Sequence, residues 1–225
     1  MNIQKNKSIF VIIICLLVLI GAGYITYSKG YFNYWQKETG NVTNQDQKNP
    51  DEEIKFTDEE VKQYEQYLKD ASPLILAGDN GNKESYLKAI ELYEKAAAIG
   101  NNNVWIPFLN IGNIYKKMGE YDKAEEAYNK ALEISKYGSE TVYLQKIDLY
   151  QYYLKKSNED VIKIYEEALS TLVENGNIVV RYSGFLRDIG ENEKALEYYK
   201  ILLDRFPENE LYKEEIAKLE AKIQK

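Results

Sequence analysis

Pairs of adjacent carboxylates are the residues of this chain best suited to chemistry. Two acidic side chains held side by side can act as general acid and general base. Glu-Glu pairs occur at five places: Glu52-Glu53, Glu59-Glu60, Glu125-Glu126, Glu166-Glu167 and Glu214-Glu215. Each pair falls in a polar linker or on the polar face of a predicted helix. We therefore predict solvated carboxylates and no catalytic residue.

Histidine is absent from the 225 residues, and cysteine occurs once, at Cys15. The chain therefore has no imidazole for a nucleophilic triad, no histidine ligand for a metal and no partner for a disulfide within the chain. The segment 78–83, GDNGNK, is rich in glycine but lacks the spacing of a phosphate-binding or calcium-binding loop. We predict a turn there, with no cofactor and no metal, and we predict that the protein is not an enzyme.

Charge is distributed unevenly along the chain. Residues 1–30 carry Lys5, Lys7 and Lys29 and no acid, whereas residues 31–225 carry 26 bases against 36 acids, a net charge of −10. An acidic body repels the phosphate backbone of nucleic acid. We therefore predict that the protein does not bind nucleic acid.

The N-terminal segment has the length of a membrane span. From Ile9 to Tyr27 it runs 19 residues without a charge, and as a helix it would measure roughly 28 Å, close to the thickness of a bilayer core. Aromatic residues follow at positions 31, 32, 34 and 35, as at a headgroup interface. We predict a transmembrane signal-anchor over 1–30, which would attach the protein to the membrane.

Two fates of this segment stay open. The apolar core over 9–20 is short and is followed by Gly21-Ala22-Gly23, which also describes a signal peptide cleaved near Gly23 to release a secreted protein. If the anchor is retained, the lysines before the span place the N-terminus inside the cell and the body outside the cytoplasmic membrane. Residues 31–57 are predicted to form a flexible polar linker with aromatic residues near the membrane.

A motif recurs in the body of the chain. An alanine is followed four residues later by a tyrosine at Ala89, Ala124 and Ala195, and Val161 begins a degenerate copy; these four anchors lie 35, 37 and 34 residues apart. Before Ala124, the segment Ile111-Gly112-x2-Tyr115 has the spacing of an amphipathic helix. A small residue at 112 lets two helices approach closely, and Gly119 fits the end of the first helix.

This pattern resembles the tetratricopeptide repeat, a 34-residue unit of two helices. The copy around Ala89, with the turn at 78–83, resembles the longer-looped Sel1-like relatives. The resemblance covers about residues 57–225 and implies an all-α fold: a right-handed solenoid of about four helix pairs with a capping helix, behind the single transmembrane helix. The repeat domain is predicted over 58–225.

Nine helices are predicted in this domain, although Pro73 interrupts the first, and the unit around Tyr150 and Val161 is the least regular. The last helix has one apolar stripe and a charged remainder, as the exposed end of a solenoid requires. The predicted ranges are 58–77, 84–99, 103–118, 121–136, 139–155, 158–174, 177–189, 192–205 and 208–224.

The resemblance also implies a binding groove lined mainly by the first helix of each pair. The groove positions in the second and fourth units are Leu109, Asn113, Lys116, Lys117, Val180, Arg181, Gly184 and Arg187. Some family members hold a peptide's C-terminal carboxylate here; Asn113 and Arg181 match that clamp, whereas Leu109 replaces a lysine. Two of the three arginines of an acidic chain would thus face one groove and could attract an acidic or carboxylate-bearing peptide.

Tyrosine is abundant, with 21 residues. Those at repeat positions, such as Tyr128, are predicted to be core, and those crowding the third unit, such as Tyr152, are either surface for binding or compositional drift. The function we expect is a membrane-anchored scaffold that binds a protein or peptide on the extracytoplasmic side, in envelope assembly or secretion. A secreted binding protein is the alternative, and a homo-oligomer built through the third unit stays open.

Overall fold

The computed structural model describes residues 56–172 and 176–224, and this part of the chain is built from α-helices. The predicted membrane span and linker lie outside the described residues. Nine α-helices occur in the described part, as predicted. They are α2 (Asp58–Asp79), α3 (Lys83–Ile99), α4 (Trp105–Met118), α5 (Tyr121–Ile134), α6 (Glu140–Asp148), α7 (Asn158–Thr171), α8 (Gly176–Ile189), α9 (Asn192–Arg205) and α10 (Glu210–Ile223).

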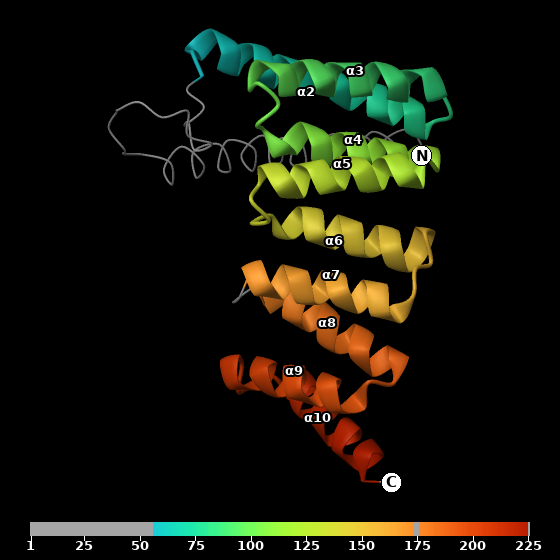
Figure 1. Cartoon of the computed structure of the whole chain (residues 1–225), viewed down its shortest axis with the longest axis vertical. Helices are drawn as coiled ribbons and strands as arrows, with labels where there is room; N and C mark the ends of the chain where they lie inside the picture. Colours follow the sequence, from blue (N-terminus) through green and yellow to red (C-terminus); the bar gives the residue numbers. More distant parts are fainter. Residues whose placement is uncertain (1–55, 173–175, 225) are drawn as a thin grey trace, which may run out of the picture. The chain divides into compact units, whose positions relative to one another are not determined.

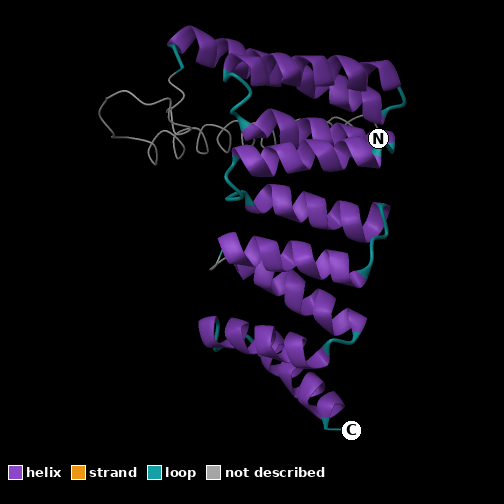
Figure 2. Ribbon diagram, in the orientation of Figure 1, coloured by secondary structure: helices purple, strands orange, loops and turns teal. Residues whose placement is uncertain are grey.

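Successive helices run in opposite directions and stack in the order of the chain (Figure 1). The closest packing is within the pairs α2–α3, α4–α5 and α8–α9, and α10 packs on α9. Figure 2 shows the short loops between the helices. Within the described residues, no helix is both long and apolar enough to cross a membrane. The described residues form an all-helical solenoid, as predicted.

Local signals in the sequence fix where several helices begin and end. At the start of α2, the Thr57 hydroxyl accepts from the Glu60 backbone N–H (3.2 Å) and the Glu60 carboxylate accepts from the Thr57 N–H (2.8 Å), which satisfies two otherwise free donors. Helix α4 ends at Gly119, whose φ of +78° is the left-handed conformation that glycine adopts without strain. The predicted stop at this residue is confirmed.

Helix α2 corrects one prediction, because it continues through Pro73 to Asp79 instead of being interrupted. A proline inside a helix removes one backbone hydrogen bond and strains the preceding turn. Packing outweighs that cost here, since Ala71 is fully buried and Leu74 and Ile75 pack against the core. The apolar face on both sides of the proline keeps the helix in one piece.

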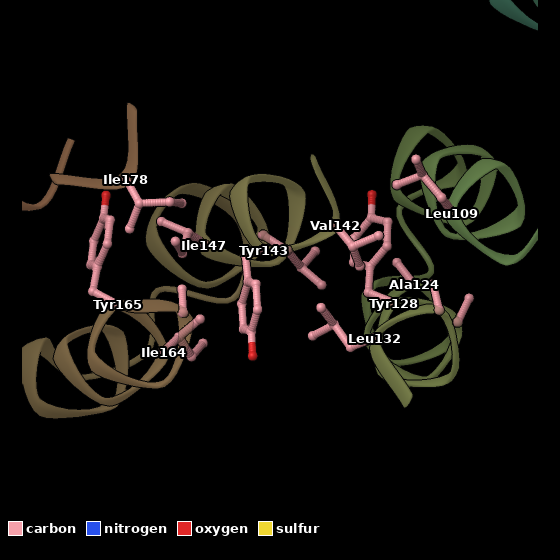
Figure 3. Packing of buried hydrophobic residues seen from close by; sticks show 14 of the residues in the cluster. Leu109, Ala124, Tyr128, Leu132, Val142, Tyr143, Ile147, Ile164, Tyr165 and Ile178 are labelled. Carbon is pink, nitrogen blue, oxygen red and sulfur yellow. The ribbon is translucent and has the colours of Figure 1, made fainter. Parts of the chain in front are cut away.

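The α4–α5 pair shows how the repeat motif holds two helices together (Figure 3). Tyr128 and Ala124 are fully buried. A Cβ atom added to Gly112 would lie 2.5 Å from the Tyr128 ring and 3.2 Å from the Ala124 carbonyl oxygen. The ring therefore occupies the space that any side chain at 112 would need, which confirms the predicted close approach. Gly78 lies against the ring of Tyr86 in the same way in the first pair.

The third pair departs from the prediction of one continuous helix over 139–155. The α-helical part of α6 ends at Asp148, and Leu149–Tyr153 form a π-helical turn, η1. This unit is longer than its neighbours, with 37 residues between Ala124 and Val161. A π-turn takes up an extra residue without ending the helix. The added length of the unit is thus partly absorbed inside its first helix.

Candidate functional site

The predicted groove residues lie on α4 and α8, which are first helices of their pairs. Figure 1 shows that α6 and α7 lie between these two helices. The basic residues of α4 and α8 are therefore not gathered into one cluster. Each instead contacts a neighbouring first helix, either the preceding one or the following one.

Two of the predicted groove residues belong to the interior of the second unit. Leu109 is 8% exposed and packs in the core. The Asn113 side-chain oxygen accepts a hydrogen bond of 2.7 Å from the hydroxyl of Tyr128. A buried tyrosine hydroxyl needs such a partner. Leu109 is therefore not available to a ligand, and the side-chain oxygen of Asn113 is already engaged by Tyr128.

Lys117 joins α4 to α2. Its ammonium lies 2.7 Å from both carboxylate oxygens of Asp79, and Asp79 also accepts from the Tyr86 hydroxyl. The hydrogen bonds from Lys117 and then from Tyr86 lower the pKa of Asp79. The positive charge of Lys117 is therefore balanced inside the chain.

The two arginines of α8 are paired in the same way. Arg181 donates to Asp148 of α6. Burial is the largest single influence on Arg181 and opposes its charge, but the bond to Asp148 and the charge of Asp148 and nearby tyrosines together raise the pKa of Arg181. Arg187 donates to Glu215 of α10 at 2.9 Å and also to Asp188. These two bonds raise the pKa of Arg187, and the bond from Arg187 lowers the pKa of the buried Glu215.

Two predicted groove residues differ from these pairs. Lys116 is a cation with no carboxylate of the described residues in direct contact, and Val180 is an exposed apolar residue. The Lys116 ammonium donates to the neutral side-chain oxygen of Gln145 on α6 at 2.6 Å and lies 5.6 Å from the centre of the Tyr153 ring. Partial burial lowers the pKa of Lys116. Val180 is 39% exposed on α8.

These contacts make a series of polar bridges along the face formed by the first helices. The bridges are Asp79–Lys117 between α2 and α4, Lys116–Gln145 between α4 and α6, Asp148–Arg181 between α6 and α8, and Arg187–Glu215 between α8 and α10. The sequence prediction identified the basic members and missed their partners. The spacing of 28 to 38 residues between partners, close to one repeat, is the signal that could have revealed them.

The arrangement offers recognition by shape and hydrogen bonding. Among the described residues, no group of three or more acidic, cysteine or histidine side chains is placed to hold a metal ion. An open hollow of about 320 Å³ between α8 and α10 is lined by Arg187, Glu215, Lys218, Leu219, Ala221 and Lys222. Its one carboxylate, Glu215, is already bonded to Arg187 and Lys218.

A comparison with protein families matches residues 107–136, most of the α4–α5 pair, to the tetratricopeptide repeat. Among curated proteins, the TPR repeat-containing protein MJ1428 of Methanocaldococcus jannaschii is 34% identical over 149 residues, which cover 63% of this chain and 23% of that protein. The BBSome complex member BBS4 of Bos taurus is 29% identical over 121 residues, or 54% of this chain and 22% of that protein. The chain thus spans less than a quarter of the length of these relatives.

Solved structures agree on the fold. The crystal structure of MamA protein matches with a TM-score of 0.50 at 17% identity, over 71% of this chain and 81% of that one. A chain in the structure of Naa15/Naa10 bound to HypK-THB matches with a TM-score of 0.51 at 16% identity, over 72% of this chain and 22% of that one. The comparisons support a tetratricopeptide repeat fold. Members of the tetratricopeptide repeat family generally bind other proteins and are typically non-catalytic scaffolds.

Proposed function

We propose that this tetratricopeptide repeat chain is a membrane-tethered scaffold that binds a protein partner on the extracytoplasmic side of the membrane. One observation carries the binding part of the proposal. Side chains bridge the first helices of successive pairs, from α2 to α10. Residues on that face therefore form one continuous, ordered surface, and preorganised surfaces bind with less loss of entropy.

The contacts also bear on how a partner would bind. Leu109 is buried, Asn113 accepts from Tyr128, and Arg181 is paired with Asp148. Arg181 and the side-chain oxygen of Asn113, which matched a carboxylate clamp, are thus engaged within the chain. This favours a partner segment that lies across the first helices over one held by its C-terminal carboxylate alone.

The membrane tether is proposed from the sequence of residues 1–30, and so is the orientation of the body outside the cytoplasmic membrane. A role in envelope assembly or secretion, and a Sel1-like first unit, are further parts of the proposal. Mass spectrometry of the mature N-terminus tests the tether, because a chain that begins near Tyr24 has lost the anchor and would be the secreted form.

Photo-crosslinking in the native membrane tests the binding surface. Replacing both arginines of α8 would break two bridges between helices, so a photoreactive residue at Val180, which is exposed, is the better probe. The matched control is the same residue at Leu87, which is 49% exposed on the second helix α3. We expect a discrete crosslinked protein from position 180 and not from position 87. Equal yields from both positions would remove the first-helix face as the binding surface.

A further inference from the structure

The π-helical turn η1 changes the surface of the third unit. It brings two consecutive exposed tyrosines, Tyr152 and Tyr153, to the end of the first helix, with exposed fractions of 65% and 43%. Single π-turns in α-helices are often found at functional sites. Tyrosine rings also bring large contact areas at low entropy cost.

The two tyrosines follow one another in the turn, and Tyr153 connects them to the second unit. The centre of the Tyr153 ring lies 5.3 Å from that of Tyr121 on α5, and the Lys116 ammonium of α4 lies over the Tyr153 ring. Tyr152 is the more exposed of the two. The turn therefore places an aromatic surface between the second and fourth units, on the face that the polar bridges cross.

Lys116 adds a charge that no carboxylate balances by direct contact. Lys117, Arg181 and Arg187 each contact a carboxylate, whereas the Lys116 ammonium contacts the amide oxygen of Gln145 and the aromatic ring of Tyr153. An ammonium group has three donors. A partly buried ammonium that has exchanged water for a neutral acceptor interacts strongly with an arriving anion.

We propose that Tyr152, Tyr153 and Lys116 form a docking platform for an acidic side chain and the adjacent apolar or aromatic side chain of a partner segment. The carboxylate meets the ammonium of Lys116, and the adjacent side chain covers the exposed tyrosine rings. This inference rests on the proposed function and names the chemistry of the partner. Charge complementarity favours this occupant, because no carboxylate of the described residues pairs directly with Lys116, on which Asp148 acts only from a distance.

Peptide binding to the purified full chain in detergent tests the proposal. The probes are labelled model peptides with one Glu-Trp, Gln-Trp, Lys-Trp or Glu-Ser pair in a common Gly-Ser background, followed by fluorescence anisotropy. We expect Glu-Trp to bind most tightly. Lys116→Gln should remove about tenfold of the preference for Glu over Gln. Tyr152→Ser should weaken Glu-Trp and Gln-Trp alike by about fivefold.

Two matched controls separate the platform from general effects. Lys117→Gln also removes one positive charge from α4, but one that Asp79 already balances, and Tyr137→Ser removes another exposed tyrosine, 43% exposed against 65% for Tyr152. Both should bind as wild type does. The proposal is overturned if wild type does not prefer Glu-Trp, or if the controls lose as much as the platform variants. Crosslinking from Val180 that persists in Lys116→Gln and Tyr152→Ser would keep the proposed function and exclude this platform.

Discussion

The second and third helix pairs carry the same repeat pattern with different residues at its tightest point. In the second pair, Gly112 and Ala124 leave room for the ring of Tyr128, and the two helices meet closely. Ile147 and Val161 stand at the corresponding positions of the third pair, and both are buried. The α6–α7 contact is much less extensive than the α4–α5 contact, and α6 is also the shorter helix, with 9 residues against 14 in α4.

A second difference lies one residue earlier. Ile111 is buried in the second pair, whereas the corresponding residue of the third pair is Lys146. Burial lowers the pKa of Lys146, and Glu125 and Glu167 act against that shift. Tyrosine hydroxyls donate to both carboxylates, Tyr150 to Glu125 and Tyr143 to Glu167. Polar groups thus surround Lys146 of α6, at the position where the second pair has the buried Ile111.

The comparison shows that two or three positions decide whether a repeat packs tightly. The family match over residues 107–136 falls on the second pair, where the small residues and the apolar residue are all present. The third unit keeps the helical spacing but loses those residues, and its first helix contains the π-turn. Tyr152 and Tyr153 lie in this π-turn, and both are exposed.

Among the variants that test this comparison, Gly112→Ala should change the stability most. The added methyl group would lie 2.5 Å from the buried Tyr128 ring, and the Ala124 backbone limits any shift. We expect the free energy of unfolding to fall by about 1–3 kcal/mol, as for other overpacked cores. Urea unfolding followed by circular dichroism measures the change.

Gly184→Ala is the matched control, since it makes the same change on α8, where a Cβ would meet nothing within 4 Å. Alanine favours a helix over glycine, so this variant should be stabilised by about 0.5–1 kcal/mol. If both variants changed stability by the same amount and sign, close packing at Gly112 would not be what distinguishes the second pair.

Most of the helix framework could be predicted from the sequence, because it depends on local signals. Apolar spacing, Gly119 and the repeat of alanine and tyrosine placed the described helices within a few residues of their observed ends, except at the end of α6, where the π-turn follows. The prediction at Pro73 was wrong because local backbone preference suggested a break, whereas the buried face of α2 spans the proline.

The candidate site was less predictable, because it depends on contacts between units. Arg181 and Arg187 were correctly placed on a first helix, but their carboxylate partners lie about one repeat away in the sequence. The π-turn has no local signature comparable to a capping residue. Among the described residues, Lys117 pairs with a carboxylate and Lys116 does not, and this difference can be known only once the neighbouring helices are in place.

Lys146→Met tests the third pair directly. Methionine keeps much of the length of lysine and removes a charge that burial disfavours. We expect the free energy of unfolding to rise by about 1 kcal/mol, since apolar replacement of buried charged groups is often stabilising. Lys163→Met on α7, where the lysine side chain is 75% exposed, should change stability by less than about 0.5 kcal/mol. A loss of stability in Lys146→Met would show that the lysine supports the two carboxylates instead of straining the unit.

The smallest expected effect comes from Tyr143→Phe, which removes one polar contact of the third pair. Tyr143 is fully buried, and its hydroxyl donates to Glu167 at 3.1 Å. Near pH 7 the variant should lose about 0.5–1 kcal/mol of stability, the net contribution of one hydrogen bond. Chemical unfolding monitored by circular dichroism measures this loss.

The pH dependence of this variant sharpens the comparison. Burial, with a contribution from Glu167, raises the pKa of Tyr143 to about 12. The unfolded tyrosine ionises near pH 10, so the stability that this residue contributes is complete below pH 10 and is lost as the pH rises toward 12. The gap between wild type and Tyr143→Phe should therefore narrow and then reverse over that interval, because the stability lost with this raised pKa exceeds the contribution of one hydrogen bond. Tyr152→Phe, at an exposed ring, should stay level with wild type throughout. A gap that stays constant from pH 8 to 12 would mean that the Tyr143 hydroxyl is not held in the buried polar network of the third pair.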